Sequence, residues 1–205
     1  MIVGAYPSAR FATIGGERDV PVGDNLGPFE NERWFDGSRV RVQPSAAELE
    51  ELYLLPLGLE RSRCWITDLV KVFLFKDGHR KKYTDLGAVV PRGYERERFE
   101  ELGRESLPWL VEEVAVSAPR VVVTLGREVA GIIRGVTGAK SRNELLRERA
   151  KAVRYGKVEV PTLHLAHPGI MMRPRGARWK QEHVQERVPA LRALLDEVGF
   201  TSDAH

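Results

Sequence analysis

The chain has 205 residues, of which 42% are hydrophobic and 30% are charged, and this composition is typical of one globular domain spanning residues 1–205. No apolar stretch approaches the ~20 residues that a membrane-spanning helix needs, and the N-terminus lacks the basic segment of a signal peptide. The single cysteine, Cys64, excludes a disulfide framework or a cysteine-based metal cluster within one chain. We therefore expect a cytoplasmic protein without membrane association.

Positive charge is gathered in two places along the chain, although the net charge is only +3. The two groups are Arg173, Arg175, Arg178 and Lys180, and His79, Arg80, Lys81 and Lys82. Clustered cations on a nearly neutral protein favour a polyanion such as nucleic acid as the partner. Solubility is the alternative explanation, because arginine-rich surfaces are common.

Strands and helices are predicted to alternate along the chain. The predicted strands are residues 2–5, 63–68, 120–125 and 158–166. The predicted helices are residues 45–55 and 141–152, each opened by a capping box (Ser45 to Glu48, Ser141 to Glu144), and residues 94–117, 127–134 and 179–198. Residues 8–44 and 76–93 are expected to be irregular loops. The alternation predicts an α/β protein with a parallel, doubly wound sheet.

Three short apolar runs end in polar, glycine- or proline-marked residues. They are Val3–Ser8, Trp65–Lys71 and Leu163–Gly169. A buried strand that opens into a functional loop has this pattern. Because ligands of open α/β sheets bind outside the carboxyl ends of the strands, we expect the three loops to form one site.

Each of these segments carries a residue that could bind a ligand or take part in catalysis. Gly4 lets a ligand approach the backbone, and Pro7 stiffens the turn, although a plain strand-to-loop turn has the same pattern. Asp68 can accept a hydrogen bond from a base or orient a water molecule; alternatively, it caps a helix or pairs with Lys71. His167 can donate to a developing oxyanion or act as an acid or base; alternatively, it bonds only within its own loop.

The ordered set of motifs resembles the uracil-DNA glycosylase superfamily. The matching segments are Gly4-Ala5-Tyr6-Pro7, Ile66-Thr67-Asp68-Leu69-Val70-Lys71, Val121–Gly126 and His167-Pro168-Gly169-Ile170-Met171. The resemblance implies a three-layer α/β/α fold with a four-stranded parallel sheet. It also implies that a damaged nucleotide of DNA is flipped into a pocket, where its N-glycosidic bond is hydrolysed. We expect no cofactor, no metal and a monomeric protein.

The resemblance also implies roles for individual residues. His167 would face the leaving base, Asp68 would face its hydrogen-bonding edge, and Asp24 and Asn25 would position the attacking water. The base pocket would be lined by Gly4, Ala5, Tyr6 and Pro7, with Phe29 or Phe11 stacked on the flipped base. DNA would be contacted by Ser8, Pro168, Gly169, Arg173, Arg175, Arg178 and Lys180, with Met171 or Met172 as the wedge that fills the gap in the base stack.

Two positions depart from the family pattern. Tyr6 stands where many members carry a carboxylate that positions water, and Asp68 stands where many carry an asparagine that reads uracil. An ionised carboxylate only accepts hydrogen bonds, so Asp68 suits a base that presents a donor. An aspartate in the middle motif is a feature of members that act on hypoxanthine, and the single cysteine excludes the iron–sulfur branch.

The function that follows is a DNA-repair glycosylase acting on a deaminated base, namely uracil, hypoxanthine or xanthine. Two alternatives stay open. One is a hydrolase of free nucleosides or nucleotides that uses the same pocket. The other is a non-catalytic nucleic-acid-binding relative that kept the fold and lost the water-activating group.

Overall fold

The computed structural model describes residues 1–7, 10–14, 18–22, 28–29, 33–35, 39–42, 44–85, 87, 89 and 92–200. The side chains of residues 10–14, 18–22, 33–35, 41–42 and 45 lie outside this description. No helix among the described residues is long and apolar enough to cross a membrane.

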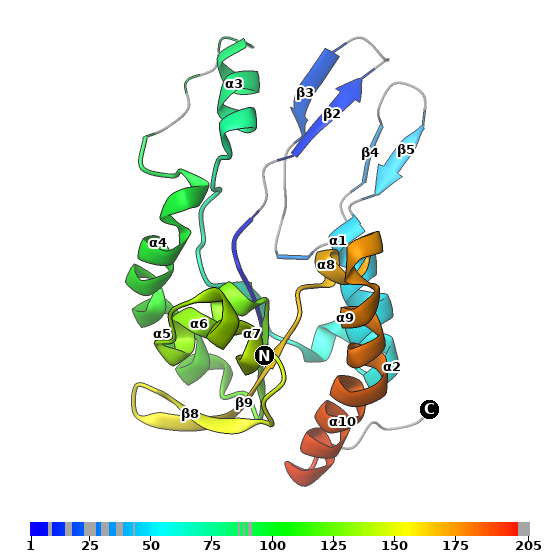
Figure 1. Cartoon of the computed structure of the whole chain (residues 1–205), viewed down its shortest axis with the longest axis vertical. Helices are drawn as coiled ribbons and strands as arrows, with labels where there is room; N and C mark the ends of the chain where they lie inside the picture. The colour runs from blue at the N-terminus through cyan, green and yellow to red at the C-terminus, as the bar shows by residue number, and fades with distance from the viewer. Residues whose placement is uncertain are drawn as a thin grey trace.

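A five-stranded sheet with the strand order β6-β1-β7-β9-β8 forms the centre of the molecule (Figure 1). Its strands are β1 (Ile2–Gly4), β6 (Ile66–Asp68), β7 (Val122–Leu125), β8 (Lys151–Tyr155) and β9 (Val158–Leu165). The first four in this order are parallel, and β8 pairs antiparallel with β9 at one edge. The four predicted parallel strands are therefore confirmed, and a fifth strand joins them.

Successive residues of the central strands pack on opposite faces of the sheet, as the two-residue period of a strand requires. Ile2 and Val123 belong to one hydrophobic cluster, whereas Val3 and Val122 belong to a second cluster on the other face. These strands are buried on both faces, which explains why their sequences are apolar without interruption.

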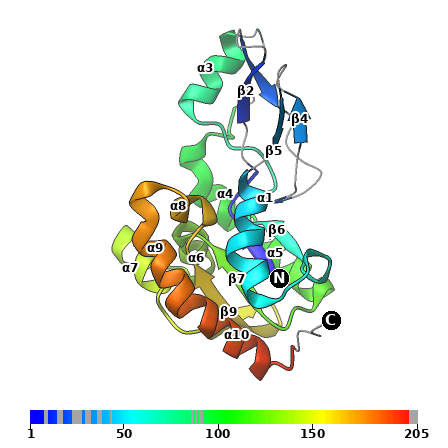
Figure 2. The ribbon, with the colours of Figure 1, turned by 90° about the vertical axis from the view of Figure 1, so that its right-hand side faces the viewer.

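Helices cover both faces of the sheet, which confirms the three-layer α/β architecture (Figures 1 and 2). One face is covered by α1 (Pro44–Leu49), a π-helical turn (Glu50–Leu54), α2 (Leu55–Leu57) and α10 (Val188–Glu197). The other face is covered by α4 (Phe99–Glu105), α5 (Leu107–Ser117) and α6 (Arg127–Arg134). The remaining helices are α3 (Asp77–Asp85), α7 (Ala139–Leu145), α8 (Pro168–Met171) and α9 (Ala177–Glu182), with a π-helical turn (His183–Arg187) between α9 and α10.

Two segments predicted as irregular contain regular structure. The first holds two antiparallel hairpins, β2 (Arg10–Ile14) with β3 (Arg18–Val22), and β4 (Arg33–Phe35) with β5 (Val40–Val42). The second contains α3, in which no side chain is buried, so its sequence lacks the apolar period that reveals a helix. Figures 1 and 2 show α3 and the hairpins projecting together from the end of the molecule where the parallel strands terminate.

Both predicted capping boxes are wrong. The helix expected to begin at Ser45 includes Pro44, and the helix expected to begin at Ser141 starts at Ala139 after Gly138. The latter ends at Leu145 rather than near residue 152, because residues 151–155 form β8. The expected strand over 63–68 is shorter, since residues 61–63 form a 3-10 turn.

Candidate active site

Gly4 and Asp68 are paired in register at the carboxyl ends of the neighbouring strands β1 and β6. The Asp68 side chain is buried, and a Cβ atom on Gly4 would overlap Asp68 Oδ1 and lie 2.7 Å from Phe29 Cε2. The pairing continues one step beyond the strands, because Val70 N donates to Ala5 O at 3.0 Å. Gly4 therefore allows a carboxylate and an aromatic ring to meet against the backbone.

Lys71 holds the backbone of Asp68. Its ammonium donates to the carbonyl oxygen of Asp68 and to Thr67 Oγ1, and it forms an ion pair with Glu113 at 2.9 Å. The contact between Lys71 and Asp68 that was predicted as one alternative is therefore present, and it is made through the Asp68 carbonyl oxygen. The lysine fixes the strand end that carries the aspartate.

Phe29 is brought to this strand edge from the long segment between β1 and α1. Its ring is buried, and its centroid lies 6.0 Å from that of the His167 imidazole. Its backbone has a φ of 57°, a left-handed conformation that is strained for a bulky residue and concentrates at functional sites. Arg61 donates to the carbonyl oxygen of the preceding Pro28 at 2.9 Å and so anchors this conformation.

His167 follows β9 and caps the N-terminus of α8. Its Nδ1 accepts a hydrogen bond from the backbone N–H of Gly169 at 3.1 Å. A ring nitrogen that accepts a hydrogen bond carries no proton, so the neutral ring has its proton on Nε2. The local bond predicted as one alternative is present, and it leaves the opposite nitrogen as a hydrogen-bond donor.

His164, three residues earlier, is buried within the sheet and bonds Thr124 Oγ1 through Nδ1 at 2.7 Å. Burial lowers the pKa of His164 to about 4, so it is neutral at physiological pH. The two histidines on this strand and its loop therefore have different environments, and His167 is the one at the carboxyl edge.

Tyr6 points into the second hydrophobic cluster. Its ring centroid lies 5.5 Å from that of Phe99, and the Arg96 guanidinium lies 5.0 Å from the Tyr6 centroid. Burial raises the pKa of the Tyr6 hydroxyl, although Arg96 opposes this shift, so the phenol keeps its proton at neutral pH. Ala5 and Pro7 are partly buried beside it.

The two methionines at the end of the short helix α8 differ in their exposure to solvent. Met171 is 2% exposed and packs in the first hydrophobic cluster, whereas Met172 is 47% exposed beside the exposed Ile170. Pro168 is buried and Gly169 is half-buried at the start of the helix. Of the two methionines considered for the wedge, Met172 is the one that reaches the surface.

The four cations that follow α8 are all exposed, namely Arg173, Arg175, Arg178 and Lys180. Arg178 and Lys180 lie on α9, which packs next to α8 in Figure 1. Three predicted residues, Ser8, Asp24 and Asn25, lie outside the described residues, and Phe11 is described only by its backbone in β2.

Glu48, expected from the sequence to be a local capping partner, has its carboxylate facing the His-Pro loop. A Cβ atom on Gly169 would lie 3.3 Å from His167 Nδ1 and 3.7 Å from Glu48 Oε2.

Within the described part of the chain, no three His, Cys, Asp or Glu side chains are grouped to hold a metal ion.

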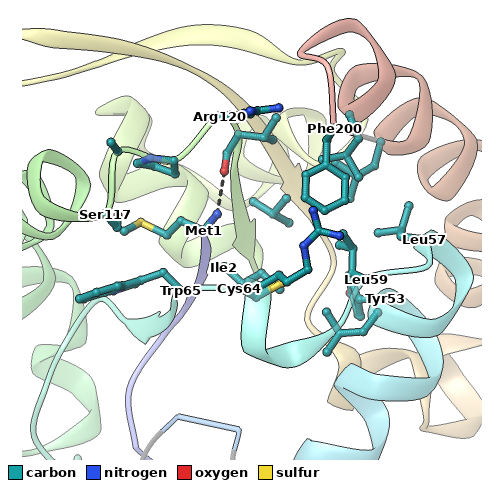
Figure 3. Close-up of a pocket in the computed structure, with 18 of the residues that line it drawn as sticks. Met1, Ile2, Tyr53, Leu57, Leu59, Cys64, Trp65, Ser117, Arg120 and Phe200 are labelled. Atoms are coloured by element: carbon teal, nitrogen blue, oxygen red, sulfur yellow. Dashed lines mark hydrogen bonds between the residues drawn. The ribbon is translucent and has the colours of Figure 1, made fainter. Parts of the chain in front are cut away.

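A pocket of about 480 Å³ lies at the opposite end of the sheet, where the parallel strands begin (Figure 3). It is lined by Met1, Trp65 and Val121, which precede β1, β6 and β7, and by Arg63, whose guanidinium lies 4.5 Å from the ring centroid of Phe200. It is therefore separate from the edge that carries Asp68 and His167. Cys64, which also lines it, is only partly buried, and burial raises the pKa of its thiol.

Gly4→Ala is expected to lower the free energy of unfolding by about 1–3 kcal/mol, because the new methyl group would collide with Asp68 and Phe29. Urea denaturation measures this loss. Gly78→Ala in α3 is the matched control, since a Cβ atom there meets nothing within 4 Å. Equal stability of wild type and Gly4→Ala would contradict the close approach at this strand edge.

The fold is that of an α/β protein, and the candidate site at the carboxyl ends of its parallel strands combines an aromatic ring, a hydrogen-bond donor and a carboxylate. The family model for the Uracil DNA glycosylase superfamily matches residues 1–194. The chain therefore belongs to this superfamily, whose members have a DNA glycosylase-like function and act on DNA. A search of curated protein sequences found no match.

Proposed function

We propose that this protein hydrolyses the N-glycosidic bond of a deaminated base in DNA (uracil, hypoxanthine or xanthine) after flipping the nucleotide out of the duplex. The observation that carries this proposal is the meeting of Asp68 and Phe29 at Gly4, with the His167 ring centroid 6.0 Å from that of Phe29, in a chain of the superfamily. We further propose that residues 1–205 act as a single domain, as a cytoplasmic monomer and without a cofactor.

The side chains of the site suit the stages of such a reaction. An enzyme cannot reach the bond between the base and C1′ inside a stacked duplex, so the base is flipped, and the Phe29 ring would stack on it. When that bond breaks, its electron pair leaves with the base, and the His167 Nε2–H would donate to the oxygen on which negative charge develops. Water supplies the hydroxyl group that bonds to C1′ and a proton that neutralises the base. Met172 would fill the gap left in the base stack.

The choice of base would depend on Asp68. An ionised carboxylate has no proton to give to uracil O4, and leaving two acceptors facing each other in a closed pocket costs about 1–3 kcal/mol. We therefore expect weak excision of uracil, with either another deaminated base preferred or no excision at all.

Asp68→Asn is expected to shift the preference toward uracil by roughly 5- to 100-fold, because an amide offers both a donor and an acceptor. The measurement is the ratio of excision rates on duplexes that differ only in the base. Asp85→Asn in α3, where Asp85 pairs with Lys81 at 2.7 Å, is the matched control. Strong excision of uracil by the wild type, unchanged in Asp68→Asn, would remove Asp68 from the pocket.

The test of the proposed function is a glycosylase assay on duplexes that contain uracil, hypoxanthine or xanthine, with an undamaged duplex as control. Release of a base from one of these duplexes and not from the corresponding free nucleoside is the expected result. Release from the free nucleoside alone would indicate the hydrolase of small molecules.

The position of Tyr6 favours a second candidate, a nucleic-acid-binding protein without glycosylase activity. Tyr6 replaces the carboxylate of many family members, and its ring packs against Phe99 and Arg96 instead of offering a group that accepts a proton from water. Binding of damaged duplex with no base release in prolonged reactions would support this candidate.

A further inference from the structure

Tyr53 connects the helical layer to the strand end that precedes His167. It lies in the π-helical turn between α1 and α2, its side chain is 1% exposed, and its hydroxyl donates to the carbonyl oxygen of Ala166. Ala166 is the residue directly before His167, although Tyr53 is 113 positions away from it in the chain. Tyr53 is not among the site residues predicted from the sequence.

The environment of Tyr53 keeps it in one orientation and one protonation state. The His183 ring lies with its centroid 4.5 Å from that of Tyr53, and His183 Nε2 bonds the carbonyl oxygen of Leu52 at 2.7 Å. Burial, together with the nearby charge of Glu48, raises the pKa of the Tyr53 hydroxyl well above its usual value. The phenol is therefore a hydrogen-bond donor throughout the neutral pH range.

The Tyr53 bond acts on a short loop whose backbone is also hydrogen-bonded on both sides of Ala166. Gly126 N donates to Leu165 O at 2.8 Å on one side of Ala166, and Ile170 N donates to His167 O at 2.9 Å on the other. The peptide group between Ala166 and His167 sets the position of the His167 backbone and therefore of its imidazole ring. The oxygen of this peptide group accepts the hydrogen bond from Tyr53, which lies in the helical layer. A small rotation of this peptide would move the Nε2–H away from the oxygen it is to meet.

We propose that Tyr53 is a positioning residue for His167: by holding the Ala166 carbonyl, it sets the direction of the His167 Nε2–H. This proposal rests on the proposed function for its kinetic consequence, and it has a structural consequence that does not depend on excision. The tyrosine touches neither the base nor the reacting sugar, and it acts through the histidine.

Tyr53→Phe removes the hydroxyl and keeps the ring. We expect the single-turnover excision rate to fall by roughly 10- to 100-fold, the scale that misplacement of a reacting group produces, with unchanged affinity for DNA. In a His167→Ala background, the same substitution should cause no further loss of rate. Tyr53 acts only through His167, and the effects of substitutions at coupled residues do not add. Tyr155→Phe is the matched control, since Tyr155 is also buried and its hydroxyl lies 3.2 Å from Thr162 Oγ1 at the far edge of the sheet.

Nuclear magnetic resonance of the His167 ring supplies the second readout. Tyr53→Phe should shift the ¹⁵N and ¹H resonances of the imidazole, and Tyr155→Phe should leave them in place. In the wild type, the Tyr53 hydroxyl proton should exchange slowly with water, which can be observed even if the variant does not fold.

The outcomes separate the two proposals. If the wild type releases no base, the proposed function fails, while the resonances still test the positioning role. Unchanged His167 resonances in Tyr53→Phe, equal rate losses with and without His167, or a rapidly exchanging Tyr53 hydroxyl would each overturn the positioning role.

Discussion

His167→Ala is expected to lower the excision rate by about 10²–10³-fold, the scale for losing one hydrogen-bond donor to a developing negative charge. The structure gives the reason for a large effect: Nδ1 accepts from Gly169 N–H, so the neutral ring presents its proton on Nε2. Single-turnover kinetics with the preferred damaged duplex measure the loss.

DNA affinity supplies the control for this substitution. The dissociation constant for the same duplex should change little, because in the proposed function the histidine contacts the departing base rather than the phosphates. A variant with full excision activity would show that His167 only caps α8.

Neutralising the cations next to α8 is expected to give the second large effect. Replacing Arg173, Arg175, Arg178 and Lys180 by glutamine should weaken DNA binding for all sequences. It should also reduce the slope of log K against log salt concentration by about 0.9 for each DNA phosphate that the variant no longer neutralises. Because all four side chains are exposed, their replacement should not unfold the protein. Binding titrations at several salt concentrations measure the slope.

A matched set of four exposed cations lies at the other end of the molecule, in and around β8: Arg149, Lys151, Arg154 and Lys157. Neutralising these changes the net charge equally and should leave the slope close to that of the wild type. Absence of wild-type binding at low salt would rule out DNA as the partner of this surface. Equal effects of the two sets would mean that only net charge matters.

The regular elements that were not predicted from the sequence have a common physical explanation, which is that exposed elements carry little hydrophobic pattern. β8 exposes most of its side chains at the sheet edge and reaches β9 through a turn at Gly156, which has a φ of 61°. α3 buries no side chain, and the hairpins β2–β3 and β4–β5 project away from the central sheet. Buried strands, in contrast, can be recognised in the sequence because both of their faces pack against helices.

Local sequence determined the four parallel strands and the polar residues at their ends. It also determined helix α6, which follows Gly126, and the last helix, α10. Because parallel strands end at one edge, it also placed Asp68 and Gly4 together, as their register shows. Local pattern was sufficient here because each feature depends on a few neighbouring residues and on burial.

Only the tertiary structure decided which distant residues meet at that edge. The left-handed backbone of Phe29 and its contact with Gly4, the burial of Met171 instead of Met172, and the hydrogen bond from Tyr53 to Ala166 all depend on how the helical layers pack on the sheet. No period or motif encodes these contacts, because they join segments far apart in the chain and are stabilised only when the whole core is formed.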